Sequence, residues 1–111
     1  MDTLNQYRQI VRQILTTYAQ VKPSYGEIAR QTIFDAEQDH YQVVNTGWEK
    51  QRRVYGCLIH VDIQAGKIWI QYDGTEAGIA NELVEAGVPK QDIVLAYQSP
   101  SMRKLTEFAV G

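Results

Sequence analysis

The chain has 111 residues, of which 44% are hydrophobic and 22% are charged, with a formal net charge of −2. This length and composition are typical of one globular domain with a modest core, and they exclude a disordered or fibrous chain. The charge balance lacks the basic excess of a dedicated nucleic-acid-binding protein, whose affinity depends on neutralising phosphates.

The first predicted element is an amphipathic helix. Apolar residues recur at helical spacing over residues 4–21, and Asp2 or Thr3 can cap the N-terminus of this helix. Pro23 ends it, because the residue before a proline is disfavoured in the α region.

Strand-forming residues dominate the middle of the chain. Short polar turns separate the runs, so neighbouring strands are antiparallel and form a meander. The runs are rich in Val, Ile, Tyr, Trp and Thr, and they cover residues 29–35, 40–48, 52–63 and 67–73.

A second helical pattern follows the meander over residues 79–84, and Gly87 marks its end. Residues 93–97 form a short extended piece. The sequence therefore predicts a single α+β domain over residues 1–111. It consists of an N-terminal helix, a four-stranded antiparallel meander, a second helix and a short C-terminal extended segment.

Two-residue hairpin loops predict a register for the strands. In this register apolar residues lie opposite one another, which a one-residue shift would disrupt. We expect the helices to cover the face that carries these residues. The predicted pairs are Ile63 with Ile68, Val61 with Ile70, Ile59 with Tyr72, Val44 with Cys57, and Thr46 with Tyr55.

The opposite face of the predicted sheet is the candidate partner-binding surface. Aromatic residues lie there among polar neighbours, a mixture typical of protein interfaces. The alternatives are that the C-terminal tail covers this face, or that the aromatic side chains only strengthen the sheet. The candidate residues are Phe34, Tyr41, His60, Asp62, Trp69 and Gln71.

Acid–base chemistry has one candidate pair, His60 and Asp62, which share a face because they are two residues apart on one strand. Cys57 has the opposite parity and cannot serve them as a nucleophile. The predicted register also places His40 and His60 on opposite faces, where they cannot share a metal ion. We therefore expect no catalytic residue, no metal site and no cofactor.

Cys57 is the only cysteine of the chain and lies in an apolar run, which favours a small buried side chain over a reactive thiol. No secretory signal and no apolar stretch long enough to span a bilayer is evident. We expect a cytoplasmic protein that has no membrane segment.

Eight short segments together resemble the XisI family, the cyanobacterial fdxN-element excision controlling factors and their relatives. The likeness runs from residue 1 to residue 111. The segments are YGEI (25–28), DHYQ (39–42), GW (47–48), RRVYGC (52–57), KIWIQ (67–71), DGTE (73–76), GIANEL (78–83) and GVPK (87–90).

This resemblance implies an accessory role in programmed, site-specific DNA excision during heterocyst development. In that system a separate recombinase cuts and rejoins the DNA, and a protein of the XisH type is a natural partner. The resemblance transfers no catalytic residue. The resemblance and the residue pattern agree in one respect. An accessory factor requires a binding surface rather than a reaction centre, and the sequence offers such a surface.

Three functional hypotheses follow. The first is a non-catalytic protein-binding module, or a homodimer, that uses the aromatic and polar face of the sheet and contacts DNA only indirectly or weakly. The second is a direct DNA-binding factor that uses Arg52, Arg53, Arg103 and Lys104. The third, less favoured, is a small-ligand receptor or enzyme built around His60 and Asp62.

Overall fold

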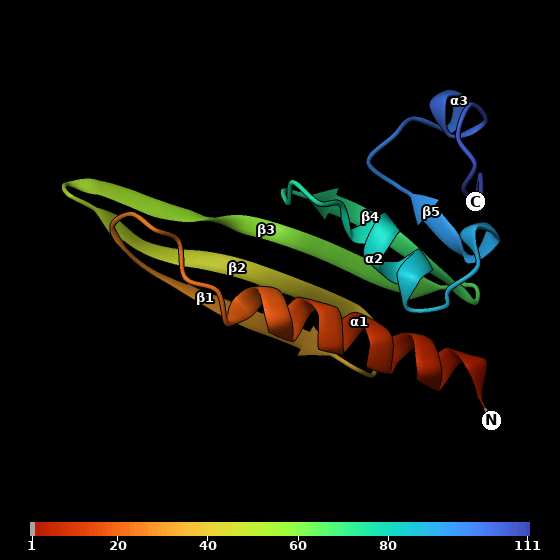
Figure 1. Cartoon of the computed structure of the whole chain (residues 1–111), viewed down its shortest axis with the longest axis horizontal. Helices are drawn as coiled ribbons and strands as arrows, with labels where there is room; N and C mark the ends of the chain where they lie inside the picture. Colours follow the sequence, from red (N-terminus) through yellow and green to blue (C-terminus); the bar gives the residue numbers. More distant parts are fainter. Residues whose placement is uncertain (1) are drawn as a thin grey trace.

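The computed structural model describes residues 2–111 as an α+β fold in which the two longer helices cover one face of a single sheet (Figure 1). None of the helices in these residues combines the length and the apolarity needed to cross a membrane. The elements are α1 (Thr3–Ala19), β1 (Glu27–Asp35), β2 (His40–Glu49), β3 (Arg52–Gln64), β4 (Lys67–Asp73), α2 (Ile79–Glu85), a 3-10 turn (Lys90–Asp92), β5 (Ile93–Leu95) and α3 (Pro100–Arg103).

Helix α1 confirms the predicted N-terminal helix. Asp2 is its N-cap, and the Asp2 carboxylate accepts a hydrogen bond from the backbone N–H of Leu4 at 3.0 Å. The helix ends at Ala19, before Pro23. Its buried residues are Tyr7, Val11 and Leu15, which recur every four residues along one face.

The sheet has five strands in the order β1-β2-β3-β4-β5. The first four form the predicted antiparallel meander, but the expectation of a four-stranded antiparallel sheet was wrong. β5 pairs with β4 in the parallel direction, with Ile68 opposite Ile93. The physical reason is the connection through residues 74–92, which contains α2 and is long enough for the crossover that a parallel pair requires.

Two β-bulges interrupt the predicted register. In β3, Val43 lies opposite Ile59 while Val44 lies opposite Cys57, so Leu58 is an extra residue. In β4, Gln71 is the extra residue, because Val61 pairs with Ile70 and His60 with Tyr72. The pairing of Ile59 with Tyr72 was therefore wrong. The other four predicted pairs are confirmed: Ile63 with Ile68, Val61 with Ile70, Val44 with Cys57, and Thr46 with Tyr55.

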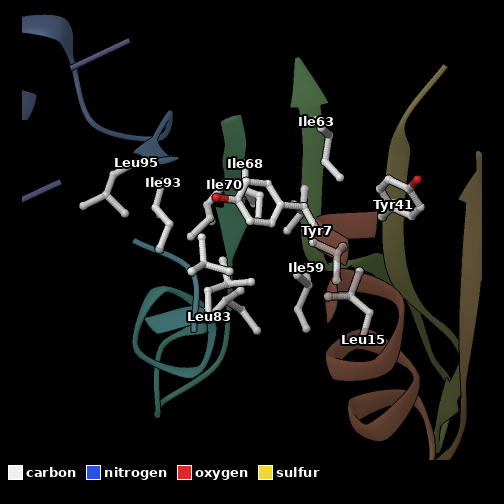
Figure 2. Packing of buried hydrophobic residues seen from close by; sticks show 14 of the residues in the cluster. Tyr7, Leu15, Tyr41, Ile59, Ile63, Ile68, Ile70, Leu83, Ile93 and Leu95 are labelled. Atoms are coloured by element: carbon white, nitrogen blue, oxygen red, sulfur yellow. The ribbon is translucent and has the colours of Figure 1, made fainter. Parts of the chain in front are cut away.

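The core lies between the two longer helices and one face of the sheet. Tyr7 and Leu15 from α1 and Leu83 from α2 meet Ile59 and Ile70 of the sheet (Figure 2). All five side chains are at least 95% buried. The second face of the sheet carries neither α1 nor α2.

Tyr41 belongs to this core, and its assignment to the uncovered face was wrong. Its side chain is fully buried, and its hydroxyl donates a hydrogen bond to Oδ1 of Asp39 at 2.9 Å. Burial, with help from Asp39, raises the pKa of Tyr41 to about 12. Phe34 was also assigned to the wrong face. It lies opposite Tyr41, packs against the core, and its ring centroid is 5.6 Å from that of Tyr41.

Arg8 of α1 fixes this corner of the core. Its guanidinium donates to both carboxylate oxygens of Asp39, at 2.8 and 3.0 Å. The hydrogen bond from Arg8 is the main reason why the pKa of Asp39 lies below its usual value. The paired carboxylate gives the hydroxyl of Tyr41 a charged acceptor at the edge of the core.

Candidate functional site

The face of the sheet directed away from α1 and α2 is the candidate site, and we name it the open face. Cross-strand pairing arranges its residues in rows. One row contains Ile33, Gln42, His60 and Tyr72 from β1 to β4. The next row contains Asp35, His40, Asp62, Trp69 and Val94 from β1 to β5.

Large apolar side chains are exposed on the open face. Tyr55, opposite Thr46, has 74% of its surface exposed, and Ile33, Trp48 and Tyr72 have 51% each. The guanidinium of Arg53 lies 5.5 Å from the ring centroid of Trp48, within cation–π range. Aromatic rings this exposed are typical of surfaces that bind another macromolecule.

None of these four residues was predicted as part of the open face, and Tyr55 and Tyr72 were expected on the helix-covered face. The pairing of Thr46 with Tyr55 was correct, but the bulge at Leu58 exchanges the faces of the residues that precede it in β3. The alternation of large side chains along β2 and β3 would have predicted these positions if the extra residue had been recognised.

A polar cluster occupies the same face beside these aromatic residues. Asp62 Oδ1 lies 2.8 Å from Nδ1 of His40 and 2.9 Å from Nε2 of His60. Asp62 Oδ2 accepts a hydrogen bond from Nε2 of Gln71 at 3.2 Å. Three of the predicted residues, His60, Asp62 and Gln71, therefore lie together as expected.

The expectation that His40 and His60 lie on opposite faces was wrong. His40 lies opposite Asp62, and Gln42 lies opposite His60, so the two imidazoles are on one side of the sheet. The prediction extended the Val44–Cys57 register through Leu58, and the bulge there changes the parity of every residue beyond it. Both rings reach one carboxylate as a result.

The charges of the cluster favour a protonated His40. The hydrogen bond to Asp62, followed by the Coulombic attraction of the same carboxylate, raises the pKa of His40 above the usual value.

Cys57 lies nearby on β3, and its thiol donates to the carbonyl oxygen of Ile59 at 3.1 Å. Burial raises the pKa of the Cys57 thiol, which disfavours the reactive thiolate.

The C-terminal segment covers one end of the open face, at Trp69. The guanidinium of Arg103 lies 5.7 Å from the Trp69 ring centroid, and Lys67 Nζ donates to the carbonyl oxygen of Gly111. Ala109 donates its N–H to the carbonyl oxygen of Ile93 at 2.9 Å. The chain itself therefore covers part of Trp69, whereas the aromatic residues farther along the face remain at least half exposed.

The four basic residues of the DNA-binding hypothesis do not form one patch. Arg52 and Arg53 lie beside the turn between β2 and β3, and Arg103 and Lys104 lie at the end of α3, at the opposite end of the molecule (Figure 1). Arg52 pairs with Glu49 at 2.8 Å. Arg103 donates to the carbonyl oxygens of Leu95, Ala96, Gln98 and Val110.

Comparisons with known proteins point to one family. The family model described as XisI protein matches residues 1–110. A XisI-like protein from Anabaena variabilis ATCC 29413 has a solved structure with 44% sequence identity and a TM-score of 0.91, over 97% of this chain and 99% of that one. No curated protein matches the chain.

A second solved structure from the same organism is similar over the full length. It has 36% sequence identity and a TM-score of 0.86, and the match covers 99% of this chain and 100% of that one. Its protein is described as the fdxN element excision controlling factor XisI.

Proposed function

The chain belongs to the XisI family, and we propose that it is a non-catalytic accessory factor in the site-specific excision of a DNA element. The support is the full-length likeness to a protein described as an fdxN element excision controlling factor. An accessory factor acts on an excision reaction by contacting other components of the machinery. The required feature is a binding surface.

The open face supports this function, and its exposed aromatic residues are the observation that carries the proposal. Tyr55, Trp48 and Tyr72 each expose at least half of their surface, although they belong to the regular strands of a well-packed sheet. Tyrosine and tryptophan combine a large apolar area with a polar group, and they supply many of the strongest contacts in protein interfaces.

The partner that we assign to the open face is the XisH-type accessory protein. The resemblance to the XisI family implies this partner, and the exposed rings offer an apolar area that a partner would remove from water. Trp69 lies at the end of the face that the C-terminal segment already covers. The docking area is therefore centred on β2 and β3, where Tyr55 lies between Trp48 and the row that contains Ile33 and Tyr72.

Replacement of single tyrosines tests the docking surface. We expect Tyr55→Ala and Tyr72→Ala each to raise the Kd for a purified XisH-type protein by at least about tenfold, because interface tyrosines are frequent hot spots. Isothermal titration calorimetry measures the Kd. The matched control is Tyr97→Ala, because the 50% exposed surface of Tyr97 is close to the 51% of Tyr72, but Tyr97 lies beyond β5.

A Kd that is the same in all three variants and in the wild type would contradict the assignment of the open face. Two further measurements separate the alternatives. A wild-type dimer in sedimentation that Tyr55→Ala dissociates would assign the face to a second copy of the chain. Salt-dependent binding to element-end DNA that Arg52→Ala and Arg53→Ala weaken would favour a direct DNA-binding factor.

A further inference from the structure

The cluster of His40, His60 and Asp62 lies on the open face and is held by the pairing of β2 with β3. His40 is the first residue of β2 and lies directly opposite Asp62 of β3. His60 precedes Asp62 by two residues on the same strand, so its side chain points to the same face. Regular strand pairing therefore holds the three side chains together without a flexible loop.

The three side chains converge on one point. His40 Nδ1 and His60 Nε2 both face Oδ1 of Asp62, at 2.8 and 2.9 Å, and the three atoms all lie within 4.8 Å of one another. The exposed fraction of the side chains rises from 13% at Asp62 to 31% at His60 and 57% at His40. Asp62 is therefore mostly buried in the sheet, and solvent reaches the three atoms from the side of His40.

We propose that His40 Nδ1, His60 Nε2 and Asp62 Oδ1 bind one divalent first-row transition-metal ion, for which Zn²⁺ is the reference. Two imidazoles and one carboxylate are a common ligand set for such ions, and three protein ligands leave a position for water or a partner's side chain. The set lacks the many oxygen atoms that Ca²⁺ and Mg²⁺ require.

The two distances to Asp62 suit this ion after a small adjustment. Bonds of about 2.0–2.1 Å to a tetrahedral Zn²⁺ place the ligand atoms about 3.3 Å apart, so each ring nitrogen moves about half an ångström from Oδ1. The two ring nitrogens, which lie within 4.8 Å of one another, take up the same spacing. The mainly exposed His40 side chain is free to make this movement. A carboxylate oxygen only accepts hydrogen bonds, so both facing nitrogens carry protons in the metal-free protein. On binding, these protons move to the other ring nitrogen or to water.

Gln71 completes the arrangement behind the ligands. Its Nε2 donates to Asp62 Oδ2 at 3.2 Å, which leaves Oδ1 directed at the two rings. Metal-binding carboxylates in proteins usually have such an outer hydrogen-bond partner, which orients the ligand. The bulge at Gln71 in β4 places this amide beside Asp62.

Titration of the full chain, prepared without a histidine tag, tests the site. We expect one Zn²⁺ per chain in calorimetry, and d–d absorption of Co²⁺ with the same stoichiometry. His40→Ala, His60→Ala and Asp62→Asn should each raise the Kd by more than about tenfold, since even outer-partner losses reach that scale. Gln71→Leu should raise the Kd by a smaller factor.

Two controls separate this site from other ligands. Cys57→Ala removes the only thiol of the chain, and Asp35→Asn removes the carboxylate opposite His40 that lies outside the cluster. Both should retain the wild-type stoichiometry and Kd. His40 is the most exposed ligand, so His40→Ala tests the site with the fold intact, which circular dichroism verifies. Absence of Zn²⁺ and Co²⁺ binding, an unchanged Kd in His40→Ala, or loss of binding in Cys57→Ala would overturn the proposal.

Discussion

Replacement of Tyr41 by alanine should lower the free energy of unfolding by about 3–5 kcal/mol, the range for removal of a large buried aromatic side chain. Tyr41 is fully buried beneath α1, and its truncation leaves a cavity beside Phe34. The substitution also removes a hydroxyl donor from Asp39. Urea unfolding followed by circular dichroism measures this loss, and Tyr41→Phe isolates the smaller contribution of the hydroxyl.

Tyr55→Ala is the matched control, because it removes the same side chain from the neighbouring strand. Tyr55 is 74% exposed on the open face, so we expect its replacement to change stability by no more than about 0.5 kcal/mol. Equal losses in the two variants would contradict the assignment of Tyr41 to the core and of Tyr55 to the open face. The pair therefore tests the effect of the bulge at Leu58 directly.

Replacement of Gly47 by alanine should destabilise the protein by at least about 2–3 kcal/mol, through overpacking and backbone strain. Gly47 lies opposite Ile28 of β1, and a Cβ atom there would be 2.1 Å from the carbonyl oxygen of Glu27. Its φ of +155° is also unfavourable for a residue with a side chain. The backbone of β1 must therefore move away from β2. Thermal unfolding by calorimetry measures the loss.

Gly56→Ala provides the comparison for this substitution. Gly56 lies in the adjacent strand, and a Cβ atom built there meets no other atom within 4 Å. We expect a change of stability below about 1 kcal/mol, because alanine also restricts the unfolded chain. A loss at Gly56 as large as that at Gly47 would show that the close approach of β1 is not the cause.

Most of the architecture was predictable from local signals. The N-cap at Asp2, the helical spacing of Tyr7, Val11 and Leu15, and the polar turns between strands each act within a few residues. β5 was not predictable as part of the sheet. It has three residues, Ile93–Leu95, too few to show the alternation of a strand, and its partner β4 is distant in sequence.

The site was predicted only in part, and the bulges explain why. A single extra residue moves every residue beyond it in the strand to the other face. The pairing of Thr46 with Tyr55 was therefore predicted correctly, but both residues were assigned to the wrong face. His60, Asp62 and Gln71 were brought together correctly, since they lie on one side of the bulge at Leu58. Tyr41 and His40 were misplaced because their positions depend on the register across that bulge. No glycine or proline at Leu58 marks the insertion in the sequence.

The parallel pairing of β5 with β4 has a consequence for the order in which the protein folds. The three hairpins close over short loops, whereas β5 must wait until the chain through α2 has returned to the β4 edge. Contacts between distant segments form slowly, because the entropy of loop closure opposes them before any contact is gained. The amide of Ala96 reports this pairing, because it donates to the carbonyl oxygen of Ile70 at 2.9 Å. In pulsed hydrogen exchange, we expect this amide to gain protection after those of β2 and β3.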